Sequence, residues 1–169
     1  SYRATANGSE VVKSDSNGKI LISHIPAGEY QLVEQKFDGY SQHDPIAVAV
    51  SNANTEDTPA TVSVENYPTE FILTKIDSDT RAALSGVSFT LLDSSNKVIS
   101  FALMLDGTYR PASTVVNSEE VVTMTTAIAT DAAGKIIIRY LPHDTYTLNE
   151  KQVEGYAPLA QIPFEITSA

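Results

Sequence analysis

The chain lacks cysteine and tryptophan altogether, and basic residues are scarce. Its 169 residues include 11 Lys and Arg against 21 Asp and Glu, for a formal net charge of −10 at pH 7. Without cysteine, disulfide staples, thiol nucleophiles and thiolate metal sites are excluded. The negative charge argues against nucleic acid and anionic membrane surfaces as partners, because phosphate groups repel an acidic surface.

Long hydrophobic runs are also missing, and the longest are only a few residues, as in Ile136–Ile138. A transmembrane helix needs about 20 apolar residues, so none is predicted, and we find no apolar signal-peptide core at the N-terminus. The hydrophobic fraction of 42% is nonetheless that of a folded protein. We therefore expect one or two small domains, which need a brace other than disulfides if they are extracellular.

An internal repeat organises the chain. Residues 14–51 align without a gap with residues 130–167, at a constant offset of 116. The identical pairs include Gly18/Gly134, Ile20/Ile136, Ile22/Ile138, Pro26/Pro142, Tyr30/Tyr146, Leu32/Leu148, Glu34/Glu150, Gly39/Gly155 and Tyr40/Tyr156. A weaker echo links Tyr2–Ala4 with Tyr109–Ala112, and residues 7–12 with residues 117–122.

The two copies are incomplete in opposite ways. Residues 70–108 have no counterpart in the first copy, and residues 52–66 have none in the second. We expect a window cut from a tandem array, with a boundary near residue 67. Residues 1–67 then form the C-terminal part of a first domain, and residues 68–169 form a second domain without its last strand. So short a junction predicts a semi-rigid rod.

Alternation of apolar and polar residues predicts β-strands along most of the chain. Examples are Lys19–Ile22, Tyr30–Glu34, Thr61–Val64 and Phe71–Thr74. Turn pairs such as Asn17-Gly18 and Asp106-Gly107 separate these runs, and only residues 125–133 suggest a short helix or a loop. The predicted fold class is all-β, with an antiparallel β-sandwich in each copy.

Four polar side chains fall in register with the apolar residues of their own strands: Glu34, Asn66, Lys75 and Glu150. Since successive residues of a strand face opposite sides, these four are expected to point inward. Burying an unpaired charge costs several kcal/mol. A place at a strand end, where the side chain reaches water, explains one such residue more easily than four.

These residue types together indicate an isopeptide bond. Desolvation in an apolar core disfavours the charged form of a lysine amine, and the neutral amine can attack the side-chain carbonyl carbon of an asparagine. A neighbouring glutamate polarises that carbonyl and moves the proton, and ammonia leaves. The bond forms once per domain, so the reaction is maturation and not enzymatic turnover.

The pattern that carries these residues resembles the Cna B-type domain of Gram-positive surface proteins and pilins. Its parts are a lysine ending the first strand, TDAAGKI at 130–136, YTLNE at 146–150 and a following GY turn. The resemblance covers nearly the whole chain as two tandem, incomplete copies. It implies a Cna-B or prealbumin-like, Ig-like sandwich, with the lysine on the first strand, the glutamate in a YxLxE motif and the asparagine on the last strand.

Carried over by position, the resemblance implies isopeptide-promoting roles for Glu34 and Glu150 and crosslinking roles for Lys75 and Asn66. Lys75 and Glu150 belong to the second domain, and Glu34 and Asn66 to the first, so the missing partner of each set is expected outside residues 1–169. The first and last strands of the family are parallel neighbours, which need a long crossover. The eight residues between Asn66 and Lys75 are too few, so we expect no bond between these two.

Other site chemistries find little support. His24, His43 and His143 are scattered on predicted turns without metal-ligand spacing, and surface positions are expected for them. The acidic turn residues form no EF-hand loop, and no nucleotide-binding or serine-hydrolase motif is present. We predict no cofactor, no metal and no enzyme activity beyond the single self-processing step.

The predicted function is a structural stalk segment of a cell-wall-anchored adhesin or ancillary pilin on the bacterial cell surface. Its expected partners are neighbouring domains, other pilus subunits and host extracellular matrix or cell-surface ligands. Residues 66–69 place threonine where pilin shafts of the family carry the lysine of a YPK motif, which favours a stalk over a shaft. Two alternatives stay open: a transthyretin-like or carbohydrate-binding module of a secreted enzyme without the bond, and a ligand-contacting adhesin tip.

Overall fold

The computed structural model describes residues 1–4, 11–116 and 120–167, and the chain divides into two compact units. The first unit comprises Ser1–Gln35 and His43–Glu65, and the second comprises Lys36–Gln42 and Asn66–Ala169. The GY turn of the first sequence copy therefore packs with the second unit. The proposed echo between residues 7–12 and 117–122 lies largely outside the described residues.

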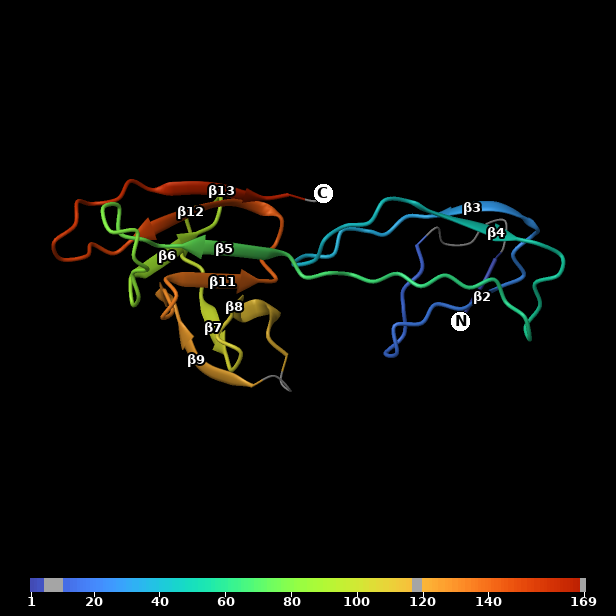
Figure 1. The fold of residues 1–169 in the computed structure, drawn as a ribbon. Helices are drawn as coiled ribbons and strands as arrows, with labels where there is room; N and C mark the ends of the chain where they lie inside the picture. The colour runs from blue at the N-terminus through green and yellow to red at the C-terminus, as the bar shows by residue number, and fades with distance from the viewer. Residues whose placement is uncertain (5–10, 117–119, 168–169) are drawn as a thin grey trace. The chain divides into compact units, whose positions relative to one another are not determined.

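Two sheets build the second unit (Figure 1). One has the order β10-β6-β12-β13, from β6 (Ser88–Leu92), β10 (Ile128–Ala129), β12 (Asp144–Glu150) and β13 (Ile162–Ile166). The other has the order β5-β11-β8-β7-β9, from β5 (Glu70–Thr74), β7 (Phe101–Met104), β8 (Tyr109–Pro111), β9 (Val121–Thr125) and β11 (Lys135–Arg139). A single 3₁₀ turn, Ala112–Thr114, follows β8. The predicted all-β sandwich is confirmed.

Alternate residues of these strands form one apolar core between the sheets. The largest fully buried side chains are Tyr146, Phe89, Phe101, Leu91, Ile128, Ile136, Ile138, Leu141 and Leu148. Phe71 of β5 stacks on Phe164 of β13 with ring centroids 4.0 Å apart, which joins the ends of the two sheets. Burying a side chain of this size contributes about 1.5–3 kcal/mol, so this core accounts for most of the stabilisation of the second unit.

Strands β5 and β13 are edge strands of their sheets. Each pairs with one neighbour, β11 and β12 respectively, and among the described residues no strand lies along the other edge. Every strand pair of this unit is antiparallel except β8 with β11. No helix among the described residues is long and apolar enough to cross a membrane.

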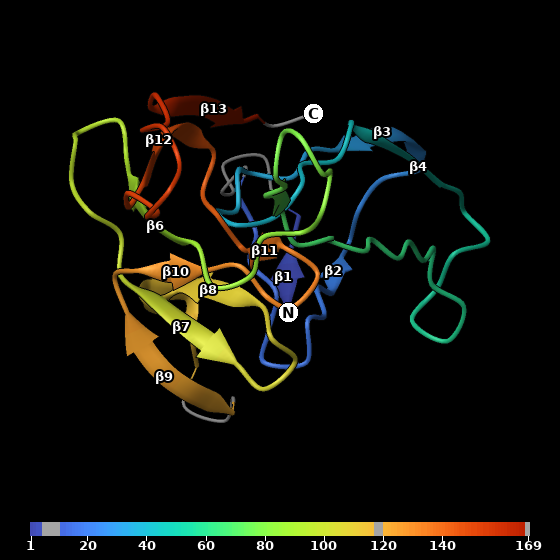
Figure 2. The same ribbon diagram turned by 60° about the vertical axis from the view of Figure 1, so that its left-hand side comes forward.

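The first unit contains two small sheets, which are visible in Figure 2. The parallel pair is β1 (Tyr2–Arg3) with β2 (Ile22–Ser23), and the antiparallel pair is β3 (Gly28–Leu32) with β4 (Ile46–Val50). None of its described residues belongs to the buried core. The two copies therefore differ sharply in how far their apolar side chains are buried.

The weak sequence similarity upstream of the repeat corresponds to the same parallel strand pairing in both copies. Tyr2 pairs in parallel with Ile22, and Tyr109 pairs in parallel with Ile138. Since Ile22 and Ile138 are equivalent in the repeat, β1 and β8 occupy the same place in their copies.

Two local predictions were wrong. Lys19–Ile22 was expected to be a strand, but only Ile22–Ser23 forms one, because its counterpart β11 has β5 as a second neighbour and β2 has none among the described residues. Thr61–Val64 was also expected to be a strand and forms none, although its residues alternate. A strand needs a partner for its backbone hydrogen bonds. Residues 125–133, for which a short helix or a loop was expected, are mostly loop and turn, with the end of β9 and the two-residue strand β10 among them.

Candidate functional site

Lys75 and Glu150 meet at one end of the second sandwich. Lys75 directly follows β5, and Glu150 is the last residue of β12 in the opposite sheet. The Lys75 Nζ atom lies 2.9 Å from Glu150 Oε1, and the two side chains are 20% and 6% exposed. The structure therefore brings together the two residues predicted for the second domain, and the expected inward orientation of Glu150 is seen.

Backbone hydrogen bonds fix both residues. Glu150 pairs with Phe89 of β6, and the next amide, Lys151 N, donates to Ser88 O at 2.8 Å. Lys75 N donates to Gly134 O at 2.7 Å, and Lys75 O accepts from Leu84 N at 3.0 Å. Because each main chain is held, the ion pair is positioned by the fold.

The pair is chemically unusual because its carboxylate is largely out of water. Glu150 Oε1 is buried and makes no conventional hydrogen bond among the described residues, so the Lys75 amine is its close polar partner. A buried ion pair recovers its desolvation cost only with good geometry and further hydrogen bonds. An amine and a carboxyl group at this distance can exchange a proton, and the amine can attack a carbonyl carbon placed beside it.

Asn66 stands at the opposite end of β5 from Lys75. The five residues of β5, at about 3.3 Å each, span roughly 17 Å, which exceeds the reach of both side chains. This geometry agrees with the expectation that these two do not bond to each other. Asn66 is half-buried and groups with the second unit, whereas Glu34 is half-buried and lies in the first.

Sequence reasoning missed a cluster of aromatic rings around the GY turn of the first copy. Phe37 stacks on Tyr40 at 4.9 Å, and Tyr40 meets the edge of Tyr140 at 5.3 Å. The Arg110 guanidinium lies 3.8 Å above the Tyr140 ring. We call Phe37, Tyr40, Tyr140 and Arg110 the turn cluster. Stacked and cation–π contacts of this kind each contribute about 0.5–1.5 kcal/mol.

Thr69 ties the backbone beneath this cluster. Its amide donates to Gly39 O at 2.9 Å, its carbonyl accepts from Tyr140 N at 2.9 Å, and its buried hydroxyl donates to Leu141 O at 2.6 Å. Gly39 is buried with a φ of +83°, and a Cβ there would lie 2.9 Å from Tyr140 O. In the sequence, only the repeated Gly-Tyr pair pointed to this site, and the sequence did not reveal which residues contact that turn.

The equivalent turn of the second copy makes a different contact. The Tyr156 hydroxyl donates to Asp77 Oδ2 at 2.7 Å. Hydrogen bonds from the Thr80 backbone and then from Tyr156 lower the pKa of Asp77 to about 2, and the Asp77 carboxylate raises the pKa of Tyr156. This contact ties residues 153–156 to the turn after β5.

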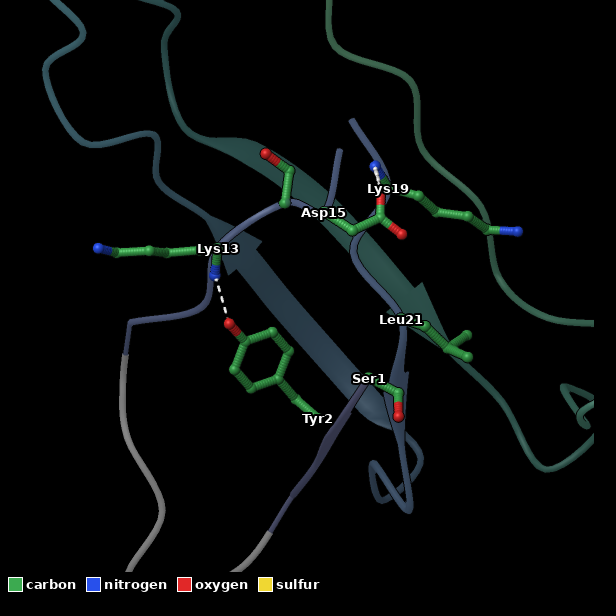
Figure 3. A pocket seen from close by; sticks show the side chains of 7 residues that line it. Ser1, Tyr2, Lys13, Asp15, Lys19 and Leu21 are labelled. Carbon is green, nitrogen blue, oxygen red and sulfur yellow. Dashed lines mark hydrogen bonds between the residues drawn. The ribbon is translucent and has the colours of Figure 1, made fainter. Parts of the chain in front are cut away.

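The surface hollows and the histidines offer little chemistry. Figure 3 shows a hollow of the first unit between Tyr2, Asp15 and Leu21, in which the side chains of Lys13 and Lys19 extend outward. The described residues contain no cluster of three or more His, Asp or Glu that could hold a metal.

The expectation of a surface position was wrong for His143, whose two ring nitrogens are buried without a hydrogen-bond partner in the described part of the chain. A turn motif reports the backbone path and not the burial of the side chain. His24 is exposed as expected, and the His43 ring bonds to the Glu65 carbonyl.

Comparison with known proteins identifies one family. The family model of the SpaA prealbumin-like fold domain matches the chain twice, over residues 2–67 and 69–169. A search of curated proteins found no match. Together the two matches cover nearly the whole chain.

Solved structures that match this chain include two pilus proteins and one further bacterial protein. The shaft pilin SpaA of Lactobacillus rhamnosus GG is 22% identical, with a TM-score of 0.44 over 93% of this chain and 65% of the pilin. The group B streptococcus pilus 2b backbone protein is 23% identical, with a TM-score of 0.43 over 72% of this chain and 40% of that one. The Bacillus anthracis TIE protein is 22% identical, with a TM-score of 0.44 over 85% of this chain and 23% of that one. The chain thus spans less than two thirds of each.

Proposed function

The chain belongs to the SpaA family of prealbumin-like fold domains, and from this premise we propose that it is a structural segment of a bacterial surface protein or pilus. The family match confirms the resemblance to tandem Cna B-type domains. Two consecutive domains, 1–67 and 68–169, then serve as load-bearing spacers on the cell surface. Their partners are neighbouring domains or pilus subunits, and a host ligand would bind elsewhere on the parent protein.

The observation that carries the proposal is the Lys75–Glu150 pair, 2.9 Å apart and largely buried at the end of two facing sheets. In the proposed reaction Glu150 accepts a proton from the Lys75 ammonium. The free amine attacks the side-chain carbonyl carbon of an asparagine, the new N–C bond forms, and the C–NH₂ bond breaks. The Glu150 carboxyl group passes its proton to the leaving group, which departs as ammonia, and takes up the second proton that the attacking nitrogen loses as it becomes the amide.

The asparagine is proposed to arrive on a strand along the open edge of β5. That edge presents backbone groups to a further strand, and Lys75 lies at its end. In the first copy, residues 52–66 follow the equivalent of β13 and end at Asn66. Asn66 is therefore the proposed crosslinking residue of the first domain, with Glu34 as its promoter and a lysine expected outside this chain.

The repeat register allows a direct test with the protein's own sequence. Residue 167 is equivalent to residue 51, so residues 1–167 followed by a second copy of residues 52–67 supply the second domain with its last strand. We expect this extended chain to weigh one ammonia less than its sequence under denaturing conditions. The 169-residue chain should show its full mass, because neither crosslink has all three groups in it.

Substitutions in the extended chain identify the groups. Lys75→Ala and Glu150→Ala should restore the full mass, whereas Glu34→Ala, at the equivalent glutamate of the first copy, should leave the deficit unchanged. A folded extended chain that keeps its full mass contradicts the crosslink. In that case the alternative function, a β-sandwich binding module without the isopeptide bond, is favoured.

A further inference from the structure

The turn Asp131–Gly134 forms a compact platform next to Lys75. The Asp131 carboxylate accepts hydrogen bonds from Ala133 N and Lys135 N, both at 2.8 Å. Asp131 N donates to Lys135 O at 2.8 Å, and Gly134 N donates to Asp131 O at 3.0 Å. The turn is thus closed by four hydrogen bonds of its own.

The first copy forms the same turn, although among its described residues no strand equivalent to β5 lies beside it. The Asp15 carboxylate accepts from Asn17 N and Lys19 N at 2.9 Å, Asp15 N donates to Lys19 O at 3.0 Å, and Gly18 N donates to Asp15 O at 3.0 Å. Gly18 and Gly134 share a φ of +72°. The turn therefore depends on its local sequence and not on the strand that packs against it.

What differs is the space around the glycine. Gly18 is exposed, and a Cβ built there meets nothing within 4 Å. Gly134 is buried, and a Cβ there would lie 2.5 Å from Lys75 O, 3.2 Å from Leu84 N and 3.2 Å from the Ala83 Cβ. The closest atom is backbone, so no rotamer change can relieve the contact.

Lys75 is held to this platform by its own main chain. Its amide donates to Gly134 O at 2.7 Å, while its carbonyl, the atom above Gly134, accepts from Leu84 N at 3.0 Å. A side chain at residue 134 must displace that carbonyl and the Lys75 Cα with it. The Nζ atom reaches Glu150 from this Cα, so its position depends on the glycine.

We propose that Gly134 is a positioning residue. Because it lacks a side chain, the Lys75 backbone can pack closely on the Asp131–Gly134 turn, and this packing places the Lys75 amine next to Glu150. The role of Gly134 in the reaction rests on the proposed crosslink, whereas its effect on the position of the Lys75 amine concerns only the Lys75–Glu150 ion pair.

The test measures the reactivity of the Lys75 amine in the full 169-residue chain. Gly134→Ala should raise the rate at which an acylating reagent modifies Lys75 several-fold, as read by mass spectrometry of peptides, with the exposed Lys97 and Lys151 as internal references. The control variants Gly18→Ala and Gly107→Ala carry the same positive-φ strain, at +72° and +80°, with no neighbouring atom within 4 Å. Both should leave the Lys75 rate unchanged.

A second pair of variants separates the contact from backbone strain. Asparagine tolerates positive φ better than alanine, so Gly134→Asn keeps the clash with Lys75 O while reducing the conformational cost, and Gly107→Asn is its control. Unchanged labelling of Lys75 in both Gly134 variants overturns the proposal. So does loss of amide protection throughout β11 in both of them, since the glycine would then serve the whole fold and not the lysine.

The extended chain distinguishes failure of this inference from failure of the crosslink. If the parent extended chain never loses ammonia, the crosslink is wrong, and the labelling contrast still decides the role of Gly134. If it loses ammonia equally fast with Gly134→Ala and with Gly107→Ala, the crosslink stands and the positioning role is overturned. Slower loss with Gly134→Ala alone is the expected result.

Discussion

Tyr30 and Tyr146 occupy equivalent places in the two copies and make the same local bond, yet their surroundings differ. Each hydroxyl donates to the carbonyl of a proline four residues earlier, at 2.8 Å to Pro26 and 2.7 Å to Pro142. Tyr30 is nevertheless 38% exposed and Tyr146 only 2%. The local sequence therefore fixes the turn and the side-chain direction without any sandwich around them.

In the part of the chain that the structure describes, only the second copy has the further strands that bury these side chains. Strand β12 lies between β6 and β13, whereas its counterpart β3 pairs there with β4 alone. Ile20 and Ile136 show the same contrast, at 39% and 1% exposure, because β11 is flanked by β5. Neighbouring strands thus bring burial in addition to backbone hydrogen bonds, and burial is the dominant stabilising term.

The largest contrast is expected at the two tyrosines. Tyr146→Ala should lower the free energy of unfolding of the second unit by about 3–5 kcal/mol, the cost of removing a large aromatic side chain from a core. Tyr30→Ala should cost less than about 1 kcal/mol, because little cover is lost. Hydrogen exchange of the β12 and β3 amides measures the two separately, and equal losses would contradict the difference in packing.

The two GY turns should differ next. Gly39→Ala combines the strain of positive φ, about 1–2 kcal/mol, with a Cβ 2.9 Å from Tyr140 O, which adds about 1–3 kcal/mol of overpacking. Gly155→Ala has the same strain at a φ of +85° and nothing within 4 Å. Urea unfolding of both variants compares them, and a Gly155 variant as unstable as the Gly39 variant would show that strain alone matters.

A smaller contrast is expected at the glutamates. Glu150→Ala leaves the largely buried Lys75 amine without its ion pair and should cost about 1–3 kcal/mol. Glu34→Ala, in the uncovered first unit, should cost about 0.5 kcal/mol or less. Thermal unfolding should therefore show a lower Tm for the Glu150 variant, and the reverse order would undermine the buried pair.

The smallest effect concerns the contact that the second GY turn makes with Asp77. Tyr156→Phe removes one donor, so the pKa of Asp77 should rise from about 2 toward its ordinary 3.8, and remain below it because the Thr80 bonds persist. A folded pKa below the unfolded value means that the stabilisation is fully present above pH 4 and is lost as the pH falls through about 2. NMR titration of the carboxyl carbon measures the shift, and an unchanged pKa would show that Tyr156 contributes nothing.

Much of the fold could be predicted because its strands and turns depend on short, local stretches of sequence. Alternation located β5 and β12, and strand parity placed Lys75 and Glu150 on the apolar faces of their own strands, whereas only the family resemblance implied that the two belong to one site. Thr61–Val64 alternates equally well and forms no strand, since pairing depends on a neighbour and not on the segment itself. The turn cluster was invisible for the same reason: Tyr140 and Arg110 reach Tyr40 only through the packing of distant segments. The repeat matched Gly134 with the turn residue Gly18, but the contact of Gly134 with Lys75 required the structure.

The most direct test of the central claim is the intact denatured mass of the extended chain, residues 1–167 followed by residues 52–67. The account predicts a deficit of one ammonia, retained with Glu34→Ala and abolished with Glu150→Ala, since it is the second copy whose described strands bury the glutamate beside a lysine. A full mass in the folded extended chain, or a deficit that survives Glu150→Ala, would contradict it.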